Sequence, residues 1–159
     1  MPRSIVAVSL LSLLIGVVAG LRTMTAVAAV SWAAYLGSLD LSGSWLLFLG
    51  YAWTPWILSA FALIEFVTDQ LPSTPSRRVP VQFGARIASG ALAGAAVGTP
   101  SGAMLAGAAA GIVGAIVGTL GGSTARGQLA KAFGSDPPAG FVEDVVALLG
   151  ALLIVVALR

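Results

Sequence analysis

The chain has 159 residues, of which 58% are hydrophobic and only 9% are charged, so it is far more apolar than a soluble globular domain. Its formal net charge of +2 is too small and too scattered to predict binding to nucleic acid. Because it has no cysteine and no histidine, thiolate and imidazole metal sites, cysteine nucleophiles and serine–histidine triads are excluded. We therefore expect an integral membrane protein that is not an enzyme and binds no metal or cofactor.

The apolar residues are gathered in long runs. A helix needs roughly 20 apolar residues to cross about 30 Å of hydrocarbon. The runs cover residues 5–21 with a continuation to residue 36, and residues 45–67, 79–98, 103–120 and 140–158. They predict a single domain, residues 1–159, with an all-α fold: a polytopic membrane bundle of about five transmembrane helices.

The first run is interpreted as a retained transmembrane helix; the alternative is a signal peptide cleaved after the small residues Val17 and Ala19. As one helix, residues 5–35 would be about 45 Å long, the thickness of a bilayer with its headgroups. Near the middle stands GLRT, which combines a weak helix former, Gly20, with the charge of Arg22 and a following Thr23. We expect the helix to break there and to line a site.

The second run begins among aromatic residues and ends with two acids. Aromatic side chains gather around the first connection, as in an interfacial belt, although a place in the core is the alternative. They are Trp32, Tyr35, Trp45, Tyr51, Trp53 and Trp56. Glu65 and Asp69 stand one helical turn apart at the other end, and so on one face.

Glycine recurs every four residues in the third and fourth runs. Such faces let helices approach closely in lipid, within one chain or in a homodimer. The repeats are Gly90, Gly94 and Gly98; Gly107 and Gly111; and Gly114, Gly118 and Gly122. The fourth run is also long, and Gly121 and Gly122 predict a second helix break.

The two predicted breaks suggest an internal repeat. Residues 16–26 and 114–125 are weakly alike, and an inverted repeat would have halves 1–72 and 99–159, with the third helix as a linker. The alternative is a shared bias towards glycine, alanine and threonine.

Basic residues give the orientation. They occur before the first helix and in every second connection, whereas the connections at residues 37–44 and 99–102 have none. They are Arg3, Arg77, Arg78, Arg86, Arg126 and Lys131. By the positive-inside rule the N-terminus is cytoplasmic, and we expect the inner (plasma) membrane of a bacterium.

Acids and arginines approach the same layer at the cytoplasmic side. An ionisable group in hydrocarbon costs at least about 2.5–3.5 kcal/mol, so it is kept for pairing or for a pathway. The candidate ligand or pathway residues are Arg22, Thr23, Glu65, Asp69, Arg86, Glu143 and Asp144. The alternatives are helix-dipole stabilisation for Glu143 and Asp144, interfacial pairing for Glu65 and Asp69, and snorkelling for Arg22. Asp40 and Asp136 are expected to be solvated in loops.

The segments GLRTMTA, IEFVTDQLPSTPSR, GGSTARG and VED, in this order, resemble the DUF4126 family of small integral membrane proteins. The resemblance covers most of the chain and matches it at Gly20, Arg22, Glu65, Asp69, Pro72 and Glu143. It implies a compact membrane fold of several helices and supplies no activity.

Two functions are compatible with these features. The first is a transporter or channel for a small solute or ion, which passes the broken helices, Arg22 and the face of Glu65 and Asp69. The alternative is a non-catalytic scaffold or partner-binding subunit whose charges lock the bundle. A membrane enzyme acting on lipid is disfavoured, since the paired carboxylates lack a nucleophile or metal-ligand motif. Membrane lipid, a homodimer partner and an unidentified small solute are the expected partners.

Overall fold

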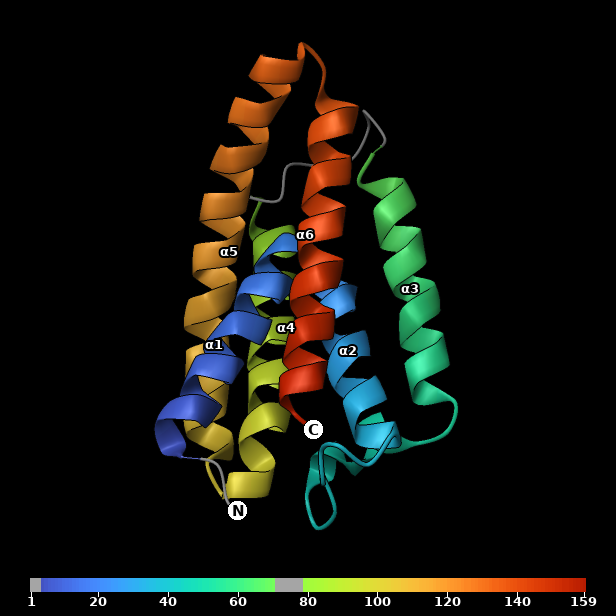
Figure 1. Ribbon diagram of the computed structural model, residues 1–159, viewed down its shortest axis with the longest axis vertical. Helices are drawn as coiled ribbons and strands as arrows, with labels where there is room; N and C mark the ends of the chain where they lie inside the picture. Colours follow the sequence, from blue (N-terminus) through green and yellow to red (C-terminus); the bar gives the residue numbers. More distant parts are fainter. Residues whose placement is uncertain (1–3, 71–78) are drawn as a thin grey trace.

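The computed structural model describes residues 4–70 and 79–159, and this part of the chain is helical with no strand. Figure 1 shows the helices as one bundle. Its elements are α1 (Ile5–Leu21), α2 (Thr23–Tyr35), the 3₁₀ helix η1 (Trp45–Gly50), α3 (Thr54–Thr68), α4 (Pro80–Gly98), the 3₁₀ helix η2 (Thr99–Ser101), α5 (Met104–Phe133) and α6 (Asp136–Ala157). The all-α prediction is confirmed. Arg3, Pro72, Arg77 and Arg78 lie outside the described residues.

The predicted break in the first helix occurs, at Arg22. This single residue has extended backbone angles, φ −140° and ψ 108°, between the end of α1 and the start of α2. Gly20 itself remains helical, so its assignment as the break is wrong by two residues. It is needed for packing instead, because a Cβ there would come within 3.0 Å of the backbone of Ala115 and Thr119 on α5.

The predicted break in the fourth helix does not occur. α5 runs unbroken for 30 residues, and Gly121 and Gly122 are ordinary helical positions within it. A glycine costs a helix only about 1 kcal/mol relative to alanine. The hydroxyls of Ser123 and Thr124 donate to the carbonyl oxygen of Leu120, 2.8 and 3.0 Å away, without interrupting the helix. With one break instead of two, the inverted repeat is not confirmed.

Glycine faces join α1, α4 and α5 at the centre of the bundle. A Cβ at Gly111 would lie within 3.0 Å of Gly90 on α4, and one at Gly114 within 3.0 Å of Leu13 and Val17 on α1. Dispersion contact between backbones takes the place of a hydrophobic drive in such packing. The predicted close approach is therefore made within one chain. A homodimer would need other surfaces, and it stays a prediction.

The distribution of polarity is that of a protein in lipid. Two of the described helices, α5 and α6, are long and apolar enough to cross a membrane, while α1 and α3 are apolar but shorter. Large apolar side chains cover the outside, whereas Arg22, Arg86 and Glu143 are buried. These features support a membrane protein. They do not confirm the predicted number of five spans. The expected single crossing by residues 5–36 is wrong, because α1 and α2 run in opposite directions from Arg22 and both have their far ends near η1 (Figure 1).

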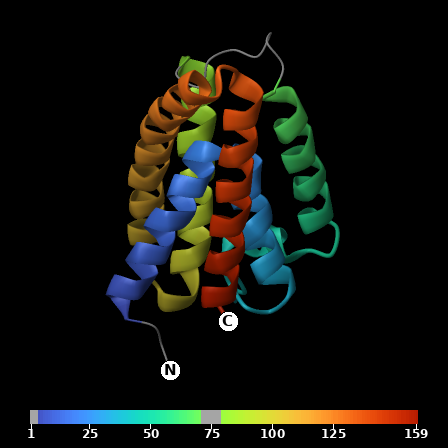
Figure 2. The ribbon, with the colours of Figure 1, turned by 45° about the horizontal axis from the view of Figure 1, so that its top comes forward.

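The helix α3 lies at the edge of the bundle in both ribbon views (Figures 1 and 2). It packs on α2 and η1, and its buried residues are Pro55 and Ala62. Trp45 at the start of η1, and Trp53 and Trp56 at the start of α3, are more than half exposed, as an interfacial belt requires. At its other end α3 approaches the buried charges.

Candidate functional site

Arg22 is the centre of the charged site, and its side chain is 0% exposed. Its guanidinium donates to the carboxylate of Asp69, which follows α3, and through Nε to Oδ1 of Asp144 on α6, 2.5 Å away. A second amino group pairs with Asp144 and lies 4.0 Å from Oε2 of Glu143. The ring of Phe66 is 5.8 Å from the guanidinium carbon, within cation–π range. One residue at the helix break thus joins α1 and α2 to α3 and α6.

The two helix ends created by the break are capped by charged side chains from other helices. Both carboxylate oxygens of Glu65 accept hydrogen bonds at the start of α2, from the N–H groups of Thr23 and Met24, each at 2.8 Å. At the end of α1, Nη1 of Arg86 donates to the carbonyl oxygens of Gly20 and Leu21, at 3.0 and 2.8 Å.

Each capping charge has the sign that the helix end favours: negative at an N-terminus and positive at a C-terminus. The hydroxyl of Thr119, which donates to the carbonyl oxygen of Ala115 at 2.7 Å, also lies 3.3 Å from the carbonyl oxygen of Gly20. The opening of the chain inside the bundle is therefore compensated by protein groups, as backbone at membrane depth requires.

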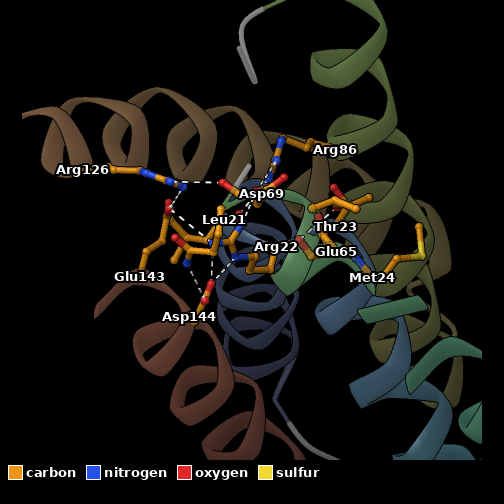
Figure 3. A network of polar contacts seen from close by, with 12 residues as sticks. Leu21, Arg22, Thr23, Met24, Glu65, Asp69, Arg86, Arg126, Glu143 and Asp144 are labelled. Carbon is orange, nitrogen blue, oxygen red and sulfur yellow. Dashed lines mark hydrogen bonds and ion pairs between the residues drawn. The ribbon is translucent and has the colours of Figure 1, made fainter. Parts of the chain in front are cut away.

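Arg126 on α5 makes the outer part of the same network (Figure 3). It donates to Oδ1 and Oδ2 of Asp136, at 3.0 and 2.6 Å, and pairs with Glu143 at 3.4 Å. It also donates to the backbone carbonyl of Asp69, at 3.2 Å. Three helices, α3, α5 and α6, are thus joined at this end of the molecule.

The structure brings all seven predicted site residues into one network. Arg22, Asp69 and Asp144 form its centre, and Thr23 contributes its backbone N–H to Glu65. Arg86 also lies 3.7 Å from the carboxylate of Asp69. We call the set formed by Arg22, Glu65, Asp69, Arg86, Arg126, Glu143 and Asp144 the charge network.

Two interpretations from the sequence need correction. Asp136 is the first residue of α6 and not a loop residue; its side chain is exposed, as expected, but it also pairs with Arg126. Because α6 begins at Asp136, Glu143 and Asp144 lie beyond its first turn, where the helix dipole has little effect. The prolines after Asp136 are a known signal of a helix start.

Asp40 lies outside the charge network. Hydrogen bonds from the hydroxyl and the N–H of Ser42 lower the pKa of Asp40.

A groove of about 690 Å³ reaches the edge of the charge network between α2, α3 and α4. Glu65, Asp69 and Thr23 are among its lining residues, together with Thr68 and Gln82. Arg22 does not line it. One edge of the network, at Glu65 and Asp69, therefore borders a groove, whereas Arg22 at its centre is covered.

Fold and site together define a helical membrane-type protein with a charge network at a broken helix. The chain belongs to the family described as "Domain of unknown function (DUF4126)", whose model matches residues 9–157. The resemblance expected from the sequence is thereby confirmed over nearly the whole chain. No curated protein and no solved structure matches the chain.

Proposed function

We propose that this protein is a small transporter or channel that carries a small solute or ion across the inner membrane of a bacterium. In this proposal α3, α4, α5 and α6 each cross the membrane, whereas α1 and α2 run in opposite directions from Arg22, so that α1 begins and α2 ends at the end of the bundle that holds η1 (Figures 1 and 2). The opposite end, where α5 meets α6, faces the cytoplasm. Arg86, Arg126 and Lys131 would then lie towards the cytoplasm, as the positive-inside rule favours.

One observation carries the proposal: the charge network surrounds a helix break and adjoins a groove lined by Glu65 and Asp69. Broken helices at membrane depth are typical of transport sites, because their free backbone ends can bind substrates and ions. Charged side chains are costly in hydrocarbon, so the few that occur there are typical of substrate and ion pathways.

The described conformation would be a closed state, because Arg22 is fully covered.

The way α3 is attached to the bundle suggests that α3 is the element that moves. Apart from Pro55 and Ala62 its side chains are at least partly exposed, and it is held by polar contacts. They include Glu65 to the start of α2, Asp69 to Arg22, and Ser59 Oγ accepting from Trp32 Nε1 at 3.0 Å. Movement of α3 away from α2 would open the groove to Arg22.

The pairing of Arg22 with two carboxylates favours a second candidate, a scaffold or partner-binding subunit. Its contacts to Asp69 and Asp144 and the capping of both helix ends also suit a permanent lock. In a scaffold the network would never open, and the protein would act through its outer surface.

Flux measurements in proteoliposomes distinguish the two candidates. Purified protein is reconstituted and tested against small cations, anions and neutral solutes, with empty liposomes as the blank. Transport predicts flux for wild type and a clear loss for Glu65→Gln in protein that remains monodisperse. Asp40→Asn is the control, because Asp40 is exposed and contacts only Ser42 among the described residues. A scaffold predicts no flux above the blank, and Glu65→Gln would then alter only stability or association.

A further inference from the structure

A second groove, between α2, α3 and α6, is apolar, and no residue of the charge network lines it. Its volume is about 470 Å³, and no acidic residue lines it. Small side chains form its floor, among them Ala28, Ala62 and Ala151, which are at most 7% exposed. Leu63 and Leu152, more than half exposed, stand at its sides. A flexible hydrocarbon chain fits such a surface.

The groove has the length of one bilayer leaflet. On α2 it reaches from Thr25 to Leu36, eleven residues apart, and on α6 from Leu148 to Arg159, also eleven apart. At 1.5 Å per residue, each side is about 17 Å long. Because the hydrocarbon core is about 30 Å thick, the groove spans about half of it, as one acyl chain does.

A basic residue stands at one end of the groove. Arg159 is exposed, and its guanidinium has no acidic partner within 4.0 Å among the described residues. The ring of Trp32 lines the same groove, and Leu36 lies beyond it at the end of α2. Arginine binds phosphate through a fork of N–H donors, and tryptophan is typical of the membrane surface. The charged end of the groove therefore matches a lipid headgroup.

We propose that the groove between α2, α3 and α6 binds an anionic phospholipid, with one acyl chain between the helices and its phosphate on Arg159. The charge of Arg159 would give the preference for an anionic lipid, and the alanine floor would hold the chain. This site does not depend on the charge network or on transport, so it can be correct even if the proposed function is wrong.

Native mass spectrometry of the delipidated full-length protein tests the headgroup. The protein is titrated with phosphatidylglycerol or phosphatidylcholine carrying the same acyl chains. We expect wild type to bind the anionic lipid about tenfold more tightly, a difference of about 1.4 kcal/mol. Arg159→Gln should remove this preference, whereas Lys131→Gln, an exposed basic residue on α5, should keep it. Equal binding of both lipids by wild type, or an unchanged preference in Arg159→Gln, would overturn the proposal.

Fluorescence quenching tests the place of the chain. Phenylalanine replaces the exposed Trp45, Trp53 and Trp56, so that Trp32 is the remaining tryptophan of the four. In detergent, phosphatidylglycerol with brominated acyl chains should quench Trp32 over the concentration range in which it binds. Arg159→Gln in this background should shift quenching to about tenfold higher lipid concentration. Binding without any quenching of Trp32 would place the lipid elsewhere and contradict the proposal.

Discussion

At the scale of single residues, the charge network depends on Arg22. A buried charge is tolerated only when it is paired, and breaking a buried pair leaves the remaining charge uncompensated. Arg22 has two close carboxylate partners, Asp69 and Asp144, and a third, Glu143, at 4.0 Å. Its backbone also separates two helices. The residue thus has a structural role whether or not the network opens.

Replacing Arg22 with methionine should destabilise the protein by about 3–5 kcal/mol, because Asp69 and Asp144 lose their buried partner. Arg22→Lys should cost less, since it keeps the charge but loses the planar fork of donors. Thermal or denaturant unfolding in detergent measures both. Equal stability of wild type and Arg22→Met would show that Arg22 is not paired as described.

The carboxylate of Glu65 should be needed at the start of α2. In Glu65→Gln one of the two accepting oxygens becomes an amide nitrogen, which cannot accept from Thr23 or Met24. We expect a loss of about 0.5–2 kcal/mol, the usual cost of removing an N-cap. The control is Asp40→Asn in an exposed loop, and an identical unfolding midpoint for the two variants would rule out the capping role.

Most of the charge network could be predicted from residue types, because few charges occur in an apolar chain and each one requires a partner. Arg22, Glu65 and Asp69 were found in this way. The pairing itself could not be predicted: Glu65 faces backbone N–H groups instead of Arg22. The packing of α3 on α2 decides this contact, and the sequence carries no local signal for it.

At the scale of elements, glycine has two different effects in this chain. In the contact of α1, α4 and α5 it permits close approach, whereas at Gly121 a Cβ would meet no atom within 4 Å. Glycine content alone therefore correctly predicted the close contact of helices, but it also predicted a break in α5 that does not occur. The break at Arg22 was predictable because a charge accompanies the glycine, while the segment around Gly121 has no such charge at its centre.

Two alanine substitutions on α5 should have opposite effects. Gly111→Ala should destabilise the protein by about 1–3 kcal/mol, because the new methyl group overlaps the backbone of Gly90. Gly121→Ala should be neutral or stabilising by up to about 1 kcal/mol, since the site is open and helical. The two unfolding midpoints measure this. A destabilised Gly121→Ala would indicate that α5 is not a regular helix there.

At the scale of the whole molecule, the aromatic end and the charged end lie apart. The connection around η1 is at the lower end in Figure 1, and the link from α5 to α6 is at the upper end. The sequence predicted the separation of aromatic and basic residues, but it also placed the start of the first helix at the basic end, whereas α1 begins at the aromatic end (Figure 1).

Accessibility of single cysteines tests the topology, because the natural chain has no cysteine. Asp40→Cys, in the connection before η1, should react with a membrane-impermeant maleimide added to intact cells. Lys131→Cys, near the end of α5, should react only after the membrane is opened. Reaction of both cysteines in intact cells would contradict the placement of these two ends of the bundle on opposite sides of the membrane.

The central claim is that the charge network opens by movement of α3, and hydrogen–deuterium exchange in nanodiscs tests it most directly. The N–H groups of Thr23 and Met24 are hydrogen-bonded to Glu65 and lose this protection when Glu65 moves away. We predict that they exchange clearly faster than the amides of α5 around Gly111, in the tightly packed centre, and faster still in Glu65→Gln. Exchange as slow as at the centre of α5 would mean a permanently closed network, and the scaffold function would then replace transport.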